Sequence, residues 1–260
     1  MYLQFDYQMQ IRYSTPVEQC FYTLKCIPKE TLRQKLLELD IQLRPASDWS
    51  YGTDGWNNRK IYGCISIPHT LFSFRVLGKV DLSPVEYEET AEADSVGMYR
   101  YPFGKCIAGS ALFQYFHSLD LTKCRNALEI SLRIMDHLHH QFSYVPNQTN
   151  LMTKAEEAWQ LGMGVCQDFA HIFIVLLRLA GVPARYVCGL LTGEGASHAW
   201  VEIFYDGKWI GMDPTNNCPI RGSHIKLADG RDASECAINR GLILSGGTQI
   251  QKIDAIVSPI

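Results

Sequence analysis

A cysteine at the start of an apolar helix is the first feature of the sequence that could do chemistry. Residues 166–180 are apolar almost all round, which predicts a central, buried helix, and Gly181 is an ordinary stop signal. Cys166 therefore falls in the first turn, where unpaired N–H groups and the helix dipole favour a thiolate, the nucleophilic form. The alternative is a small cysteine packed in the core, the usual position of a free thiol.

A histidine and an aspartate come together on a predicted hairpin further along the chain. Asp206-Gly207 is the strongest two-residue turn signal, and it separates two strand-like segments, residues 197–205 and 208–213. With a two-residue loop, His198 and Asp213 become diagonal neighbours on one face, about 7–8 Å apart at the backbone. A carboxylate there would fix the imidazole tautomer and support its protonated form, as the base of a nucleophile requires.

Four short motifs carry these residues, and together they resemble a known family. Their order and spacing are similar to those of the transglutaminase-like superfamily, specifically its bacterial, protease-like branch, over about residues 125–220. The motifs are Gly164-Val-Cys-Gln-Asp-Phe-Ala-His171, Gly181-Val-Pro-Ala-Arg-Tyr-Val187, Ser197-His-Ala-Trp-Val-Glu202 and Asp213-Pro-Thr-Asn216.

The resemblance implies a papain-like α+β core, in which a helix bearing the cysteine packs on an antiparallel sheet bearing the histidine and the aspartate. It implies a catalytic triad of Cys166, His198 and Asp213. Residues 224–232 also resemble the segment that follows the triad in the bacterial members. The chain departs from them at residues 233–236, where those proteins usually carry an aromatic residue and prolines.

Two differences from animal transglutaminases, and three further groups that could contact the substrate, bear on the type of reaction. Animal transglutaminases place tryptophan directly after the nucleophile, where Gln167 stands here, and no upstream tryptophan lies near Ile130. Gln160 occupies the offset at which papain-like proteases carry an oxyanion-hole glutamine, although a surface glutamine ending a short helix is the alternative. The backbone N–H of Cys166 is a second candidate oxyanion donor. Trp200 either walls the cleft as a substrate contact or fills the core.

Three functions follow from these residues. The leading hypothesis is a thiol-dependent hydrolase, a cysteine protease acting on peptide or isopeptide amide bonds through an acyl-enzyme. The second is a protein-glutamine transamidase or deamidase that uses the same triad. The third is a catalytically silent peptide-binding module. The expected partner in each case is a protein or peptide, and the oligomeric state stays open.

The rest of the chain predicts the elements that must position the site. Residues 1–95 read as a β-rich, sandwich-like N-terminal domain, because short strands with period-2 alternation are separated by proline and glycine. The acidic stretch 83–105 is interpreted as a solvated connector. Residues 96–260 are predicted to form the catalytic domain. Tyr51 and Trp56, in a polar loop, either reach over the cleft or cap the N-terminal core.

Composition excludes several classes of function. Apolar residues make up 47% of the 260 residues and the net charge is −3, which argues against disorder and against nucleic-acid binding. No apolar run is long enough to span a membrane, so no membrane partner is expected. The nine cysteines form no C-x-x-C pair, and the N-terminus reads as a strand instead of a signal peptide, which predicts a cytoplasmic protein. We expect no metal and no cofactor, because no such motif is present.

Overall fold

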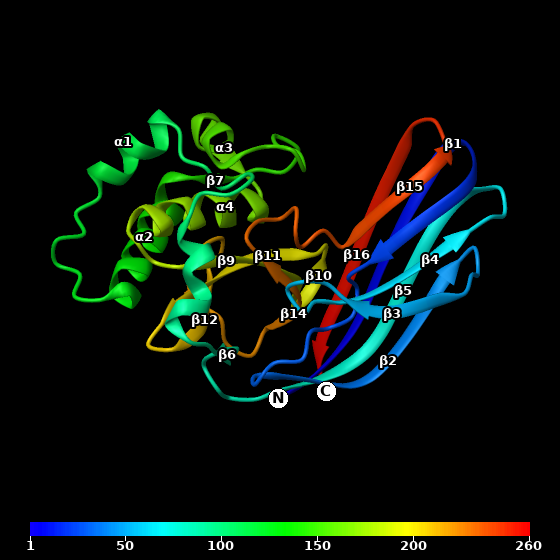
Figure 1. Cartoon of the computed structure of the whole chain (residues 1–260), viewed down its shortest axis with the longest axis horizontal. Helices are drawn as coiled ribbons and strands as arrows, with labels where there is room; N and C mark the ends of the chain where they lie inside the picture. The colour runs from blue at the N-terminus through cyan, green and yellow to red at the C-terminus, as the bar shows by residue number, and fades with distance from the viewer.

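The computed structural model describes residues 1–260 and contains two curled antiparallel sheets, one of which is covered by helices (Figure 1). The first is an eight-stranded sheet, hereafter the N-terminal sheet. Its strands are β1 (Tyr2–Leu24), β2 (Gln34–Arg44), β3 (Trp49–Thr53), β4 (Arg59–Ile65), β5 (His69–Leu82), β10 (Gly193–Gly195), β15 (Asn239–Ser245) and β16 (Gln249–Pro259).

Strand β1 organises the N-terminal sheet because it is long enough to pair with four other strands. Its first half lies between β5 and β16, and its second half lies between β4 and β15, with the register interrupted between Arg12 and Val17. The predicted alternation is present: Leu3, Phe5 and Tyr7 are buried while the residues between them are not. The buried side chains form one core inside the curled sheet.

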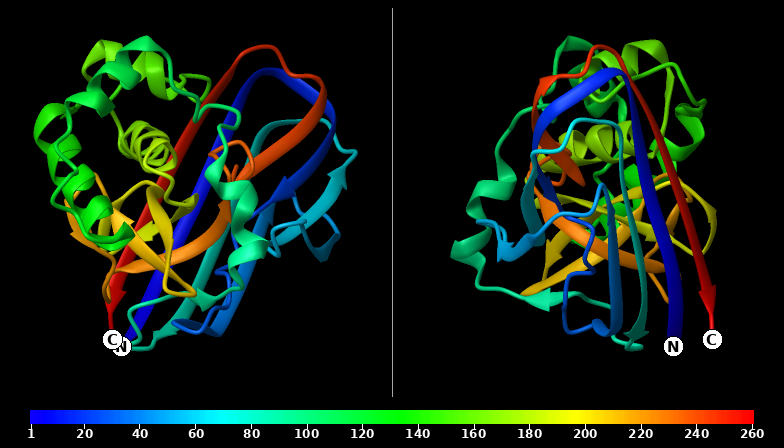
Figure 2. Two further views of the ribbon diagram at one scale, coloured as in Figure 1. Left: turned by 60° about the vertical axis from the view of Figure 1, so that its left-hand side comes forward. Right: turned by 90° about the vertical axis from the view of Figure 1, so that its right-hand side faces the viewer.

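The C-terminal residues belong to this same sheet, and here the structure differs from the predicted catalytic domain of residues 96–260. Strand β16 pairs with β1 from Leu3↔Pro259 to Tyr13↔Gln249, and Ala255 is part of the N-terminal core. Figure 2 shows β16 running beside β1 with the two termini next to one another. Residues 239–259 therefore belong with the N-terminal strands, because β15 and β16 complete a sheet that begins at residue 2.

The second sheet is six-stranded and carries the predicted hairpin, so it is hereafter called the hairpin sheet. Its main path runs β13-β12-β11-β9-β14, with β6 paired to β12, and every pairing is antiparallel. The strands are β6 (Glu89–Thr90), β9 (Ala184–Leu191), β11 (His198–Tyr205), β12 (Lys208–Asp213), β13 (Cys218–Pro219) and β14 (His224–Gly230).

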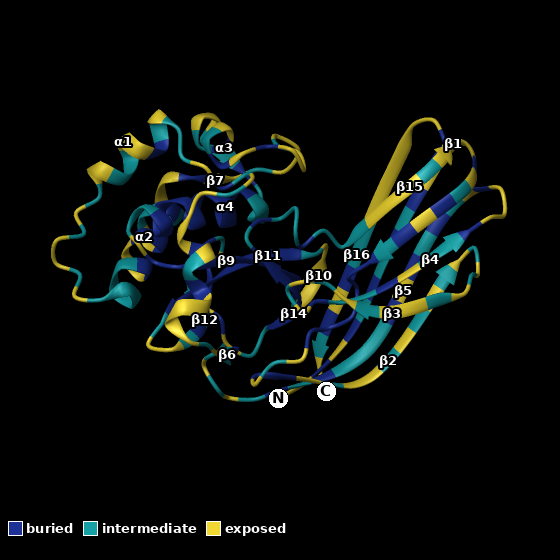
Figure 3. Ribbon diagram, in the orientation of Figure 1, coloured by how far each residue is buried: buried dark blue, intermediate teal, exposed yellow.

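The α-helices cover one face of the hairpin sheet, and the central one begins at the predicted cysteine. They are α1 (Ser110–Ser118), α2 (Ala127–Gln141), α3 (Ala155–Leu161) and α4 (Cys166–Leu179). The 3₁₀ helix η1 (Ala93–Arg100) instead packs against Phe204 and Trp209, which alternate along the strands with the residues that face the α-helices. From Asp168 to Arg178 every residue of α4 is buried, as its apolar sequence predicts. Figure 3 shows α4 and the strands beneath it among the most buried parts of the molecule. No helix of the protein has the length and apolar character needed to cross a membrane.

The predicted connector at residues 83–105 is more ordered than a solvated linker. It forms β6 and η1, and Tyr99 packs edge-on against Trp209 of the hairpin sheet at 5.0 Å between ring centroids. Glu88 is buried in an ion pair with Arg33, and Glu89 pairs with Arg185. These two acidic residues therefore pair with cations from other segments, which the local charge pattern does not reveal.

Candidate active site

Cys166 is half-buried and is the first residue of α4, so its N–H has no acceptor within the helix. The chain reaches it through a reversal at Gly162, which adopts a left-handed φ of 71°. The first turn is fixed by Asp168, whose Oδ2 accepts from the N–H of Val165 at 2.8 Å and from the Thr149 hydroxyl at 2.6 Å. These contacts hold the thiol at the N-terminus of the helix, as predicted.

His198 and Asp213 meet as the predicted hairpin register requires. Strands β11 and β12 pair from Tyr205↔Lys208 to Val201↔Met212, which is the register expected for a two-residue turn. His198 Nε2 then lies 2.7 Å from Asp213 Oδ2, and the Asp213 carboxylate is completely buried. The predicted contact between these two side chains is confirmed.

Asp213 is held by more donors than its sequence neighbourhood predicts. Its Oδ1 accepts from the backbone N–H groups of Thr215 and Asn216, at 3.0 and 3.1 Å. Its Oδ2 accepts from Asn216 Nδ2 at 2.7 Å, in addition to His198. Burial alone would raise the pKa of Asp213, but the bonds from His198 and His224 and the other donors hold it well below its usual range. The carboxylate is therefore ionised at neutral pH.

The electrostatics of His198 connect it to both Asp213 and Cys166. Burial acts to lower the pKa of this imidazole, but hydrogen bonding and charge from Asp213 and from Cys166 outweigh burial and raise the pKa to about 10. At neutral pH the ring is therefore an imidazolium that faces the carboxylate on one side and interacts with the thiol. Such a ring can hold a proton ready for a leaving group.

His224 is a member of the cluster that sequence reasoning did not assign. It is the first residue of β14, is buried, and places Nε2 3.1 Å from Asp213 Oδ2. Strand β14 pairs with β9 and not with the β11–β12 hairpin, so no local pattern brings this residue to Asp213. The available signal is the motif at 224–232, which marks the segment without giving the histidine a role.

Gln160 and Trp200, the two tentative binding residues, each match the structural alternative that the sequence left open. Gln160 is exposed on α3, where its Nε2 lies 3.3 Å from Glu156, the carboxylate that caps the N-terminus of α1. A role for Gln160 as an oxyanion donor stays a prediction. Trp200 is completely buried and packs with Val187 and Ile220, so it cannot wall a cleft. Its side chain fills the core beside the His198 and His224 rings.

Tyr144 lies beside the nucleophile and was not predicted. Strands β7 (Ser143–Tyr144) and β8 (Met163–Gly164) are parallel and place Tyr144 opposite Gly164, two residues before Cys166. The ring stacks on Phe169 at 6.5 Å and is 54% exposed. Burial and the charge of Cys166 raise the pKa of its phenol. An exposed aromatic face therefore lies near the thiol.

A second group of charges, most of them buried, lies at the hairpin sheet and is hereafter called the ion-pair network. Arg185 contacts Glu202 at 2.5 Å. Burial acts to raise the pKa of Asp229, but the cations around it hold that pKa well below its usual range. The members of the network are Lys29, Glu89, Arg185, Glu202, Lys226 and Asp229.

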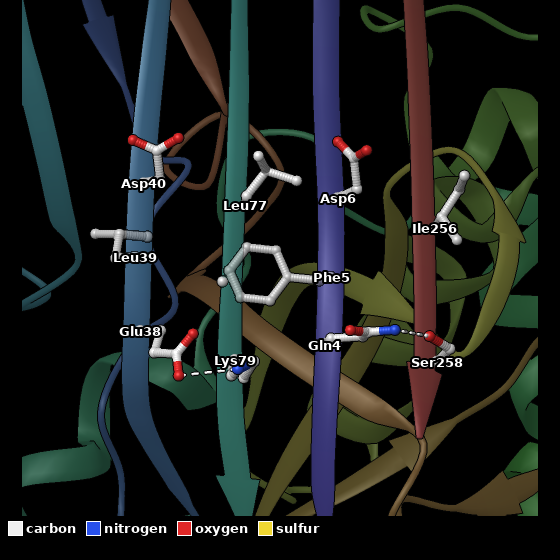
Figure 4. A pocket seen from close by; sticks show the side chains of 11 residues that line it. Gln4, Phe5, Asp6, Glu38, Leu39, Asp40, Leu77, Lys79, Ile256 and Ser258 are labelled. Atoms are coloured by element: carbon white, nitrogen blue, oxygen red, sulfur yellow. Dashed lines mark hydrogen bonds and ion pairs between the residues drawn. The ribbon is translucent and has the colours of Figure 1, made fainter. Parts of the chain in front are cut away.

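The N-terminal sheet carries a surface hollow of about 490 Å³ that lacks catalytic groups. Figure 4 shows its lining side chains on β2, β5, β1 and β16, with Lys79 paired to Glu38 and Gln4 bonded to Ser258. No cysteine or histidine lines it. Trp56, expected to reach over a cleft or to cap the N-terminal core, packs instead against Tyr99.

Donor atoms of His198, Asp213 and His224 lie within 4.8 Å of one another, and their types would suit a divalent cation. In this arrangement both rings already direct Nε2 at one carboxylate oxygen, Oδ2 of Asp213. We therefore interpret the three side chains as a hydrogen-bonded group, hereafter the site cluster.

Together, the fold and the site define a papain-like α+β protein, with a thiol at the start of its central helix and an imidazole–carboxylate pair on the adjoining sheet. Residues 119–214 match the transglutaminase-like superfamily, and residues 3–81 match the bacterial transglutaminase-like N-terminal region. The two matched ranges together cover more than half of the chain, which therefore has a transglutaminase-like core and a bacterial transglutaminase-like N-terminal region.

One solved structure shares the fold, and relatives match parts of the sequence. A candidate cysteine protease from Cytophaga hutchinsonii shares the fold, with a TM-score of 0.80 and 22% identity over 99% of this chain and 91% of that chain. An uncharacterized protein of Mycobacterium leprae is 36% identical over 117 residues, or 41% of this chain and 42% of the relative. An uncharacterized protein of Mycobacterium bovis is 24% identical over 91% of this chain and 86% of the relative.

A shorter similarity involves a named enzyme. The protein-glutamine gamma-glutamyltransferase of Pseudomonas aeruginosa is 30% identical over 92 residues, which is 30% of this chain and 14% of that protein. The chain therefore spans less than half of the Mycobacterium leprae relative and a small part of the Pseudomonas aeruginosa enzyme.

Proposed function

We propose that the protein is a thiol-dependent hydrolase of peptide or isopeptide amide bonds that works through an acyl-enzyme. In this proposal Cys166 is the nucleophile, His198 is the general acid and base, and Asp213 orients the imidazole. The observation that carries the proposal is the 2.7 Å contact between His198 and a buried carboxylate, with the Cys166 thiol interacting with the same ring. A half-buried thiol at a helix N-terminus supplies the reactive group.

The chemistry follows from these positions. The Cys166 thiolate attacks the amide carbonyl, a C–S bond forms, and the carbonyl oxygen becomes an oxyanion to which the unpaired N–H of Cys166 can donate a hydrogen bond. His198 gives its proton to the leaving nitrogen as the C–N bond breaks, which leaves a thioester. Water, deprotonated by His198, then attacks the thioester and releases a carboxylic acid and the free thiol. Asp213 keeps the imidazole in the tautomer that both steps need.

A protein-glutamine transamidase or deamidase is the second candidate. The local similarity to the Pseudomonas aeruginosa glutamyltransferase favours it, because the matched stretch is 30% identical. Both candidates form a thioester on Cys166. A transamidase resolves it with a lysine amine, whereas a hydrolase or a deamidase resolves it with water. A silent peptide-binding module is the third candidate, and it has no need of an activated thiol.

Mass spectrometry of a peptide library separates the three candidates. The library is incubated with the protein in the presence and absence of a primary amine, with Cys166→Ala as the matched control. Cleaved peptides support the hydrolase, and amine adducts or deamidated glutamines support the transamidase. Identical spectra for the protein and for Cys166→Ala, with no labelling by a thiol-reactive probe, would leave only the binding module.

The cytoplasmic location is part of this proposal and stays a prediction. It is supported by nine cysteines that are all free in the structure, a usage typical of reducing compartments. Fractionation of cells expressing the full chain tests it, and recovery of the protein outside the cytoplasm would contradict it.

A further inference from the structure

We propose that His224 is a positioning residue, a neutral imidazole that hydrogen-bonds the same Asp213 oxygen as His198 and thereby weakens the carboxylate's hold on His198. The inference rests on the proposed function, because it assigns His224 a role in the acid–base chemistry of His198. His224 does not contact the substrate in this proposal; it acts through Asp213.

The geometry joins residues from three strands. His224 begins β14, which pairs with β9 at His224↔Leu191, whereas His198 begins β11, which pairs with the other edge of β9 at His198↔Gly189. Asp213 ends β12, beyond β11. Although their strands are not adjacent, His224 Nε2 lies 3.1 Å from Asp213 Oδ2, and only 3% of His224 is exposed.

The contacts of His224 fix both its charge and its tautomer. Burial lowers the pKa of His224, and the opposing effect of Asp213 does not restore it. A neutral imidazole has one donor and one acceptor nitrogen. Because Nε2 faces a carboxylate, which only accepts, Nε2 must carry the hydrogen. Nδ1 then accepts from the Ser223 hydroxyl, 2.9 Å away.

A chain of hydrogen bonds therefore runs from Ser223 through His224 to Asp213, where it meets the bond from His198. Oδ2 accepts three bonds, from His198 and Asn216 at 2.7 Å and from His224 at 3.1 Å. Each neutral donor takes up part of the negative charge on this oxygen, so less charge is available to stabilise the His198 imidazolium. His224 thus leaves His198 acidic enough to give its proton to a leaving group.

Other charged and titratable groups around the site cluster are few. Cys166 on α4 interacts with His198, Arg33 adds a like charge near His224, and Cys218 on β13 lies near Asp213. Asp213 keeps its remaining donors when His224 is changed, so its position and ionisation survive the substitution. A change in the pH at which His198 loses its proton would then report the loss of the His224 donor.

Alkylation of Cys166 by iodoacetamide as a function of pH tests the role without a substrate. The upper step of the profile reports loss of the His198 proton. We expect His224→Leu to move this step upward by about half a pH unit, as expected for one neutral hydrogen bond. His224→Gln restores an N–H donor and should return the step toward its original position. His117→Gln, at an exposed histidine on α1, is the matched control.

Each outcome decides the inference. A step that stays in place or moves downward in His224→Leu, or that moves equally in both His224 variants, would overturn it. If His224→Leu fails to fold by circular dichroism, Ser223→Ala takes its place, with a smaller upward shift expected and no shift overturning the inference. A wild-type profile without any step that depends on His198 would instead overturn the proposed function, and the inference with it.

Discussion

Two groups of buried, titratable side chains lie on the same sheet and differ in what surrounds them. In the ion-pair network each charge contacts opposite charges, as where Lys226 Nζ lies 2.8 Å from Glu202 and 2.9 Å from Asp229. In the site cluster Asp213 is equally buried, but His198 also interacts with a half-buried thiol. The charged groups of the ion-pair network pair with one another, whereas the site cluster also interacts with the reactive thiol of Cys166.

The comparison shows that shifted pKa values do not by themselves mark a catalytic centre. Asp213 and Asp229 both have a pKa held well below the usual range by surrounding donors or cations. What separates the two regions is access to a nucleophile at a helix N-terminus. The network is therefore expected to contribute to stability, and the site cluster to chemistry.

The largest expected effect is the loss of activity on changing the nucleophile. Cys166→Ala should reduce turnover to background, because no other group can form the thioester, and should leave the fold intact because little volume is removed. Activity on the cleaved peptides and thermal unfolding measure the two properties. Turnover close to that of the wild type would mean that another residue is the nucleophile. The two groups of buried side chains would then no longer differ in their access to the nucleophile.

Substitutions at the base and its carboxylate partner should follow in size. His198→Ala is expected to lower the rate by about 10²–10⁴-fold, as is typical for removing a general base. Asp213→Asn should lower it by no more than that, because it leaves the imidazole in place but permits the wrong tautomer. Initial rates at saturating peptide give the comparison. A greater loss for Asp213→Asn would mean that the carboxylate does more than orient the ring.

A substitution in the ion-pair network should show the opposite pattern. Lys226→Met leaves Glu202 and Asp229 with less compensation, and breaking a buried ion pair costs about 3–5 kcal/mol of unfolding free energy. Denaturant unfolding measures this loss, and the activity of each folded molecule should change little. If activity fell while stability held, the network would have to be counted as part of the site.

The smallest expected effect concerns a single histidine, His171, which contrasts with His198. It is completely buried and accepts from the N–H of Ala233, and burial lowers its pKa to about 3. A histidine with a lowered folded pKa binds its proton more readily when unfolded, so stability is lost as pH falls from about 6.5 towards 3. The raised pKa of His198 has the opposite sign: its stabilising contribution is present below pH 6.5 and is lost as pH rises through about 10.

Unfolding measured between pH 6 and pH 4 tests this sign. His171→Gln should flatten the dependence of unfolding free energy on pH by up to about 1.4 kcal/mol per pH unit, the value for one proton. An unchanged slope would show that His171 is accessible or protonated in the folded protein.

Local patterns predicted the parts of the molecule that are fixed by neighbours in the sequence. The turn at Asp206-Gly207 sets the register of β11 and β12, and that register alone brings His198 to Asp213. The apolar run after Cys166 sets α4 in the core. These inferences need no knowledge of distant segments, because a two-residue loop and a helical period determine the geometry.

The remaining parts depend on pairings between distant segments. His224 reaches Asp213 only because β14 lies against β9, and no spacing in the sequence encodes that neighbour. The pairing of β16 with β1 similarly could not be derived from alternation, which gives a face but not a partner. Gln160 occupies a familiar offset before the cysteine, yet Glu156 on the same helix engages its side chain.

The pairing of β1 with β16 has a consequence for the time at which the protein matures during synthesis. Strand β1 emerges from the ribosome long before its neighbour β16, so this part of the N-terminal sheet closes only after residue 259 has been made. Strand β10, which lies just before His198, is itself paired to β16 at Gly195↔Ala255. Until β16 has been translated, β10 has no partner strand and the segment before His198 is unsupported. A nascent chain that still lacks β16 should therefore not have assembled the site around Cys166.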